Sequence, residues 1–453
     1  MTFDKVITNG TLINPENMTA DIGNLGIINN KIAAISKQQL TGKEIFDATG
    51  KIVSPGFIDI HGHVDGYHYS SELSLRQGIT TTVGGNCGHS PINMQEFFHE
   101  QTVNPRPINQ AELMGMTSSL REAVGLNNPR QAANQEQLRN MQYLVEKAMD
   151  EGACGLSVGL AYAPETSDQE LYSLAKIAAK YGRIITVDTR LFTPSDLYSL
   201  VEVIALAKTI NARVQISHFV YQYGTGMVEE ALQLIDTARR QGVDIRLDSG
   251  MYTQWATGLQ AVLFDETSLQ ESNMQLEDVL IVTGQYKGQR LNQQLYQQLR
   301  QIPREQERIS AVVFTGVEED IYTALKHPYA MPSTDIGRYE KGEGHPQIAG
   351  SFPRYLCKMV REKGYLTLTE AIRKATLLPA QTLNLQQKGR LSENADADLV
   401  IFDLKTIKDN AGFLPDALPD APPDGIDYVF VNGQLALEHG KLKDQRAGKP
   451  LIY

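Results

Sequence analysis

Residues 55–63 read Pro55-Gly56-Phe57-Ile58-Asp59-Ile60-His61-Gly62-His63, an apolar run that ends in two histidines. Residues i and i+2 share one face of an extended strand. His61 and His63 would therefore point the same way from a strand end, where two imidazoles can bind one metal ion. A His-x-His pair by itself is more often a pair of ordinary histidines. The prediction of a metal site therefore depends on further ligands elsewhere in the chain.

The length and the charge of the chain limit the classes of protein it can be. At 453 residues it is long enough for a large barrel and a smaller satellite domain. Its formal net charge of −11 argues against a nucleic-acid partner and against binding to anionic membranes. The sequence has no apolar stretch as long as a membrane helix, so we expect no membrane partner.

The cysteines and the first residues bear on the compartment. Cys87, Cys154 and Cys357 are widely spaced and odd in number, which is not typical of a disulfide framework. The first residues lack the basic and apolar segments of a signal peptide. We therefore expect a cytoplasmic protein, and a homo-oligomer is compatible with these features.

The middle of the chain alternates strand-like and helix-like runs, which is typical of parallel βα units. Eight such units predict an α/β protein built on a (β/α)8 TIM-like barrel. The candidate strands are residues 57–61, 79–83, 154–158, 184–188, 214–218, 243–248, 311–315 and 329–335.

Both ends of the chain read as short strands separated by turns, and neither end alone can bury a core. We predict that residues 1–54 and 385–453 together form a small β-sandwich domain. Residues 55–384 would form the barrel. A Gln-rich insertion at about 265–310 is a candidate lid over the site, and residues 88–130 form a second excursion.

Metal-binding residue types gather where the predicted strands end. Active-site residues of this barrel lie at the carboxyl ends of its strands. A set of imidazoles, one thiol and carboxylates favours zinc over magnesium or calcium, and it suffices for one or two Zn²⁺ ions, which a thiolate could bridge. The predicted ligands are His61, His63, Cys87, Asp188, His218 and Asp335.

Most of these residues also have an ordinary structural explanation. Cys87 could be an inert buried thiol, although its flanking glycines would leave the sulfur approachable. His218 could be a core histidine, and Asp335 could be a helix N-cap. Asp188 could be the ion-pair partner of Arg190.

The chemistry that such a site supports is metal-assisted hydrolysis. Zinc lowers the pKa of a bound water and polarises a substrate carbonyl. A carboxylate at the end of the last strand could take a proton from the water and pass it to the leaving amine. Asp335 is the residue predicted for that role.

The chain resembles the amidohydrolase superfamily, and in particular its N-acyl-D-amino-acid deacylase (D-aminoacylase) branch. The stretch 53–63 is similar to the strand-one signature of the superfamily. The stretch 78–88, which contains Cys87, is similar to the cysteine motif of that branch. Most of the superfamily bridges its metals with a carboxylated lysine instead. Further similar stretches are 216–218, 318–320, 327–328, 345–346 and 350–354.

The resemblance implies roles for individual residues. His61, His63 and Asp335 would surround one metal position. Cys87 and His218 would hold the other position, and Cys87 could bridge the two. Asp335 would also be the general acid and base, and Tyr252 would contact the substrate or its oxyanion, so the two are the implied catalytic residues.

Three positions depart from the branch, and all three lie at the site. The branch has a metal-binding histidine where this chain has Asp188, a lysine shortly after His218 where this chain has Phe219-Val220, and an arginine where this chain has Gln347. The lysine and the arginine bind the substrate carboxylate, so this chain lacks both charge-assisted contacts. The residues that could replace them are Arg190, Tyr221 and Tyr223. The predicted substrate-binding residues are Arg190, Tyr252 and Gln347.

The function that these observations favour is zinc-dependent hydrolysis of a C–N amide bond in a small molecule, most simply an N-acyl-D-amino acid. One alternative is a cyclic amidase that opens a hydantoin- or dihydroorotate-like ring. The other alternative is an inactive barrel that serves as a binding protein, and the joint presence of the predicted ligands argues against it.

Overall fold

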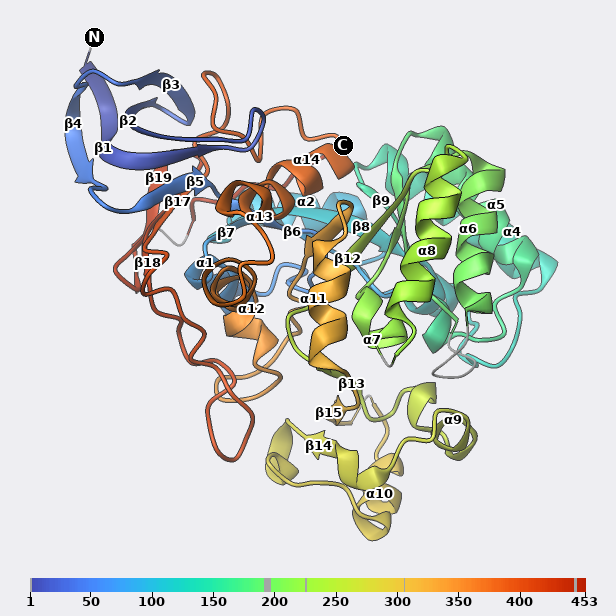
Figure 1. Ribbon diagram of the computed structural model, residues 1–453. Coiled ribbons are helices and arrows are strands. Elements are labelled where there is room, and N and C mark those ends of the chain that lie inside the picture. The colour runs from blue at the N-terminus through green and yellow to red at the C-terminus, as the bar shows by residue number, and fades with distance from the viewer. Residues whose placement is uncertain (1, 191–196, 225, 305, 444–445) are drawn as a thin grey trace.

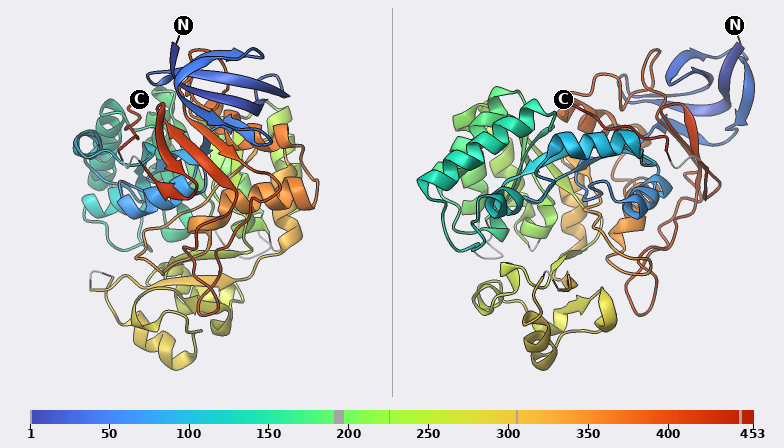
Figure 2. Two further views of the ribbon diagram at one scale, coloured as in Figure 1. Left: turned by 90° about the vertical axis from the view of Figure 1, so that its left-hand side faces the viewer. Right: turned by 180° about the vertical axis from the view of Figure 1, so that it is seen from behind.

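A computed structural model describes residues 2–190, 197–224, 226–304, 306–443 and 446–453 (Figure 1). The chain forms a parallel barrel covered by helices, a β-sheet domain at one side, and a small insertion at one end of the barrel (Figures 1 and 2). This arrangement confirms the predicted α/β fold, a TIM-like barrel with a separate β domain. No helix among the described residues is long and apolar enough to cross a membrane.

The barrel is an eight-stranded parallel sheet in the order β16-β12-β11-β10-β9-β8-β7-β6. Nearly all residues of these strands are buried, as expected for a barrel whose inner face is filled by its own side chains and whose outer face is covered by helices. The strands are β6 (Phe57–Asp59), β7 (Ile79–Gly84), β8 (Asn109–Gly115), β9 (Gly155–Gly159), β10 (Ile184–Asp188), β11 (Val214–Ile216), β12 (Ile245–Ser249) and β16 (Ala330–Pro332).

One of the predicted barrel strands is wrong. Residues 311–315 belong to β15 (Ser310–Phe314), which pairs antiparallel with two strands of the insertion. The barrel strand that the sequence analysis did not predict is β8, because its polar residues Asn109, Gln110 and Glu112 make it unlike a buried strand. Asn109 donates to Asp398, and Gln110 donates to Glu112 Oε2 at 2.8 Å, so these two amides are hydrogen-bonded while buried, although Glu112 Oε1 has no partner among the described residues.

Helices cover the outside of the barrel (Figure 1). α4 begins with a capping box in which Asn134 and Gln137 satisfy each other's backbone donors, and its apolar residues lie on one face. The helices around the barrel and its edges are α1 (His68–Arg76), α2 (Met94–Val103), α3 (Arg121–Ala123), α4 (Gln135–Asp150), α5 (Asp168–Lys180), α6 (Tyr198–Ile210), α7 (Phe219–Tyr223), α8 (Val228–Arg240), α11 (Glu318–Lys326), α12 (Gln347–Tyr355), α13 (Leu368–Ala375) and α14 (Leu377–Thr382).

The β domain combines the two ends of the chain in one nine-stranded sheet. Apolar side chains from both ends share a separate buried core, which includes Leu25, Ile27, Leu399 and Phe430. The strands are β1 (Thr2–Asn14), β2 (Thr19–Ile28), β3 (Lys31–Ser36), β4 (Thr41–Asp47), β5 (Ile52–Pro55), β17 (Leu399–Phe402), β18 (Ile426–Val431), β19 (Gln434–Glu438) and β20 (Lys441–Leu442).

The chain between β12 and β16 contains a small insertion with its own sheet and core. β13 (Gln254–Gly258), β15 and β14 (Val279–Ile281) form a three-stranded antiparallel sheet, which packs with α9 (Glu266–Glu271) and α10 (Gln293–Arg300). Because the insertion leaves the barrel at the carboxyl end of β12, it lies at the same end as the predicted ligands (Figures 1 and 2).

Candidate metal centre

The first and last barrel strands are joined at their carboxyl ends by hydrogen bonds. The buried Asp59 accepts from the Thr334 hydroxyl at 2.5 Å and from the Thr334 backbone N–H at 3.1 Å. The Asp335 N–H donates to the His61 carbonyl at 2.8 Å. These bonds hold Asp335 directly beside His61.

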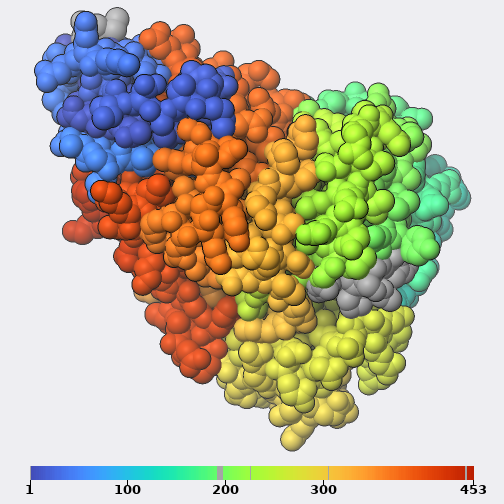
Figure 3. All heavy atoms as spheres, in the orientation of Figure 1, coloured from blue at the N-terminus to red at the C-terminus, as the bar shows by residue number. Residues whose placement is uncertain are grey.

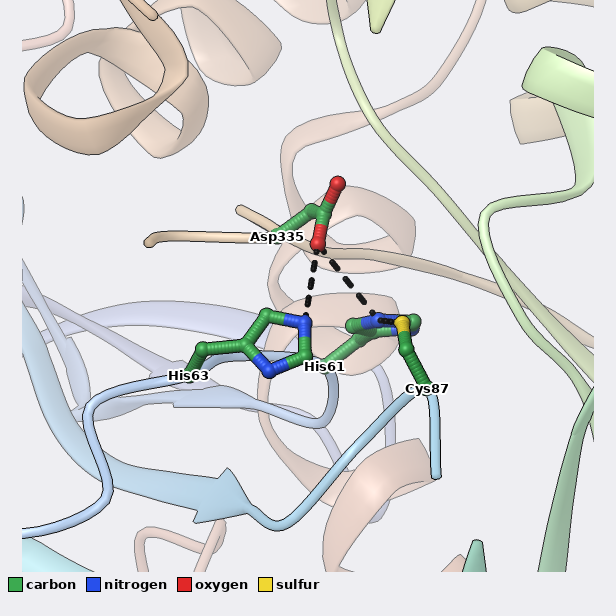
Figure 4. A group of neighbouring side chains, drawn as sticks. All are labelled: His61, His63, Cys87 and Asp335. Carbon is green, nitrogen blue, oxygen red and sulfur yellow. Dashed lines mark hydrogen bonds and ion pairs between the residues drawn. The ribbon is translucent and has the colours of Figure 1, made fainter. Parts of the chain in front are cut away.

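Four predicted ligands meet in one group, drawn in Figure 4: His61, His63, Cys87 and Asp335. Asp335 Oδ1 lies 3.3 Å from His63 Nε2 and 3.6 Å from His61 Nε2. Cys87 Sγ lies 3.3 Å from His61 Nε2. The side chains come from the segments that follow β6, β7 and β16, and their ligand atoms converge as a metal site requires (Figure 4).

A second group consists of Cys87, Asp188 and His218, so Cys87 belongs to both. His218 Nε2 lies 3.7 Å from Cys87 Sγ and 3.6 Å from Asp188 Oδ2. Asp188 is 1% exposed, and neither of its oxygens accepts a hydrogen bond from the described residues. A buried carboxylate without donors is costly unless a cation is present, so this donor set fits a metal ion.

Two alternative explanations for these residues do not match the structure. Asp188 does not pair with Arg190, because the Arg190 guanidinium binds Glu202 at 2.9 Å. Asp335 is not a helix N-cap, since the described residues directly after it form no helix.

The backbone is strained at three of the clustered residues. Cys87, His218 and Asp335 have φ values of +52°, +30° and +50°, a region that side chains other than glycine rarely adopt. Such conformations cost about 1–3 kcal/mol each and persist where the surrounding structure holds them, typically at functional sites. The strain therefore marks these positions independently of their side-chain chemistry.

The turn that carries Cys87 depends on Gly85. Its φ is +76°, and an added Cβ would overlap the carbonyl oxygen of Leu113 in β8. We expect Gly85→Ala to lower the free energy of unfolding by roughly 2–4 kcal/mol and to weaken metal binding, because the turn must move. Thermal melting and metal analysis would measure both effects.

The control for this change is Gly182→Ala. Gly182 also has a positive φ, +68°, but a Cβ added there would have no atom within 4 Å. We expect the substitution to cost about 1 kcal/mol and to leave metal binding intact. Equal effects of the two substitutions would contradict the importance of the Gly85 turn.

Charge and burial act against each other within the site. Burial alone would raise the pKa of Asp335, but a hydrogen bond from His63 and the charges of His61 and His218 lower it to about 2. Burial would lower the pKa of His61, but Asp248 and Asp335 raise it to about 10. Burial and the neighbouring carboxylates raise the pKa of the Cys87 thiol. The site thus keeps its carboxylates ionised beside positive charge. A bound metal ion would supply such a charge.

Asp248 is a site residue that the sequence analysis did not single out. Its Oδ2 lies 3.3 Å from His61 Nδ1, and its Oδ1 accepts from the His218 N–H at 3.0 Å. Gln215 and Ser333 also donate to it, at 2.7 Å and 2.8 Å. Asp248 therefore orients the His61 imidazole, as carboxylates behind metal-binding histidines do, and it fixes the backbone of His218. Its position at the end of a predicted strand was the available signal.

The three residues predicted to bind substrate, Gln347, Tyr252 and Arg190, each form hydrogen bonds within the protein. Gln347 Nε2 donates to the Asp335 carbonyl at 2.8 Å, and its Oε1 accepts from the Tyr221 hydroxyl at 2.9 Å. The Tyr252 hydroxyl donates to Asp409 at 2.7 Å. The bonds of Arg190 to Glu202 and to backbone carbonyls satisfy its guanidinium, so a contact with substrate would require them to break.

Comparison with known proteins agrees with this fold and site. Residues 44–113 and 336–436 match models described as "Amidohydrolase family". An N-acyl-D-glutamate deacylase of Alcaligenes xylosoxydans xylosoxydans is 31% identical over 468 residues, which cover 95% of this chain and 93% of that protein.

Two solved structures superpose over the whole of both chains. One is N-acyl-D-glutamate deacylase from Bordetella bronchiseptica, complexed with zinc and a phosphonate inhibitor that mimics the tetrahedral intermediate, with a TM-score of 0.88 and 27% identity. The other is a D-aminoacylase studied for its binuclear metal centre, with a TM-score of 0.87 and 26% identity.

The barrel and the clustered ligands define a metal-dependent hydrolase of carbon–nitrogen bonds other than peptide bonds. The chain belongs to the amidohydrolase family, in its D-aminoacylase branch.

Proposed function

We propose that this protein is a zinc-dependent deacylase that hydrolyses the amide bond of N-acyl-D-amino acids. The observation that carries the proposal is the shared position of Cys87 in two groups of potential ligands. Relatives that span nearly the whole chain act on N-acyl-D-glutamate or are D-aminoacylases, which supports the substrate class.

The proposal assigns one metal position to His61, His63, Cys87 and Asp335 and a second to Cys87, Asp188 and His218. A thiolate that belongs to both groups would allow one ion or two. A bound zinc ion would supply Lewis acidity toward the substrate carbonyl and activate water near neutral pH.

Asp335 is the proposed general acid and base. Its Oδ1 faces the histidines, whereas its Oδ2 lies 3.5 Å from Gln347 Nε2. The carboxylate would take a proton from the attacking water and deliver it to the leaving nitrogen. The neighbouring histidines hold the pKa of Asp335 low, so the carboxylate is ionised, which is the form that can accept a proton.

Gln347 is proposed to hold Asp335 in place, since its amide bonds both the Asp335 carbonyl and the Tyr221 hydroxyl. Tyr252 is proposed to lie on the substrate side, where its hydroxyl could donate to the oxyanion after it releases Asp409. Arg190 is proposed to bind substrate only if its bonds to Glu202 break.

Amine release from matched N-acetyl-D- and N-acetyl-L-amino acids tests the proposal. Ring opening of hydantoin and dihydroorotate would be followed in parallel. We expect cleavage of the D substrates, with rates for the L substrates and the rings at least about 100-fold lower, since a chiral pocket orients the amide for only one enantiomer. Activity on rings alone would replace the proposal with the cyclic-amidase alternative.

The organisation and location of the protein are also proposals. We propose that residues 1–54 and 385–453 form one folding unit and residues 55–384 the barrel unit, with a lid at about 265–310. The three cysteines are buried and unpaired, which supports a cytoplasmic location. A homo-oligomer is compatible with this organisation.

A further inference from the structure

Two arginines at the end of the insertion lack a partner among the described residues. Arg304 and Arg308 are both exposed, and neither guanidinium forms a hydrogen bond or an ion pair with any described side chain or carbonyl. The other arginines of the insertion are engaged. Arg300 binds Asp265, and Arg290 binds the Glu277 carbonyl and lies over the ring of Phe314. In a chain with a net charge of −11, two neighbouring cations without partners favour an anionic ligand.

Arg308 lies next to the loop that carries Asp335. Tyr339 follows Asp335 by four residues, and its ring packs against the apolar cluster of Leu280, Val282 and Val312 in the insertion. The same loop is tied to the insertion where the Gly344 N–H donates to the Val282 carbonyl at 3.1 Å. Because Arg308 precedes Ser310, the first residue of β15, by two residues, it is placed at the junction of the insertion and this loop.

The segment that follows Cys87 lies close to the same part of the insertion. The ring of His89 lies 6.3 Å from the ring of Tyr162, and the Tyr162 hydroxyl bonds the Thr257 hydroxyl at 3.0 Å. Thr257 pairs with Ala311 of β15, which follows Arg308 by three residues. The end of the insertion that carries the arginines therefore lies beside the metal-binding groups. Figure 3 shows the surface of the insertion, in yellow, at the lower edge of the molecule.

Two arginines on the barrel side are engaged elsewhere. Arg190 binds Glu202, and Arg354 binds the Met251 carbonyl at 3.0 Å and lies 3.6 Å from Asp409. Gln347 and Tyr221 form a neutral hydrogen-bonded pair next to Asp335. The barrel side of the pocket therefore offers no unpaired cation to a substrate carboxylate among these groups, whereas the insertion offers two.

We propose that Arg304 and Arg308 bind a carboxylate of the substrate at the entrance to the metal site and thereby determine specificity. The inference rests on the proposed deacylase function. A guanidinium offers a planar pair of donors that matches a carboxylate, and it stays charged at every pH at which the enzyme would work. The carboxylate is either the one on the α-carbon or one on the amino-acid side chain.

Three substrates distinguish the two carboxylates: N-acetyl-D-methionine, N-acetyl-D-glutamate and N-acetyl-D-methioninamide. They would be assayed for amide cleavage with the parent, with Arg304→Gln, with Arg308→Gln and with the double variant. We expect kcat/KM of the double variant to fall about 30- to 100-fold on substrates whose carboxylate is bound, mainly through KM, and the cleavage of the amide substrate to be unchanged. The salt dependence of kcat/KM should also decrease, because the lost contacts are exposed and screened.

Arg139→Gln is the matched control. Arg139 is an exposed arginine on α4, so this variant changes the net charge in the same direction. A loss on both acids would identify the α-carboxylate, and a loss on glutamate alone the side-chain carboxylate.

Unchanged kinetics of the double variant on both acids would overturn the inference while leaving the deacylase function intact. A parent enzyme that releases no amine from either acid would overturn the proposed function and this inference with it.

Discussion

Asp335→Asn is expected to lower kcat for amide hydrolysis by about 10³-fold, while the protein remains folded and retains part of its metal. The amide of asparagine has a similar shape but cannot take a proton from water or return it to the leaving nitrogen. His61, His63 and Cys87 remain in place to hold the ion. The measurement is kcat together with metal content and a thermal melt.

The control is Asp416→Asn, which makes the same chemical change at an exposed residue. It should leave kcat within about twofold of the parent, as surface substitutions usually do. Full activity of Asp335→Asn with normal metal content would rule out the acid–base role of Asp335.

Cys87→Ala is expected to remove most of the tightly bound metal and, with it, most of the activity. Cys87 is 5% exposed, and its sulfur lies 3.3 Å from His61 Nε2 and 3.7 Å from His218 Nε2. Because it belongs to both ligand groups, its loss would disturb both positions. Losing even an outer-shell partner of a metal site costs about 10- to 100-fold in affinity, so we expect at least that loss here.

Cys154→Ala separates a metal ligand from a buried thiol that only packs. Cys154 is 2% exposed and lies outside both ligand groups. We expect it to cost about 1 kcal/mol of stability and to leave the zinc affinity unchanged. If Cys87→Ala bound zinc as tightly as Cys154→Ala, Cys87 would be an ordinary buried thiol.

The sequence predicted the candidate ligands because they follow buried runs. His61 and His63 end an apolar stretch, and Cys87 is flanked by glycines. The carboxyl ends of parallel strands meet at one end of a barrel, so residues far apart in sequence could be placed together without any contact information.

Other features could not be predicted in this way. The strand β8 escapes sequence reasoning because its polar residues pair with one another and with the β domain. The apolar stretch 311–315 resembles a barrel strand because apolar content does not distinguish a parallel pairing from an antiparallel one. The positive φ values of His218 and Asp335 arise from tertiary contacts, and no neighbouring glycine indicates them.

The arginines of the insertion illustrate a further limit. Their proposed role follows from where the insertion docks, whereas the sequence predicts the insertion only as a segment of about 265–310. The spacing of Arg304 and Arg308 in the sequence does not relate them to Asp335, but Tyr339 packs against Val282 and Val312 of the insertion and so connects the two regions.

The most direct test of the account is the rate of N-acetyl-D-glutamate hydrolysis measured on one preparation before chelation, after chelation and after zinc is returned. The account predicts that hydrolysis is lost with the metal and recovers in proportion to the zinc that is bound, and that Cys87→Ala fails to recover at the same zinc concentration. An unchanged rate in protein from which all metal has been removed would contradict it.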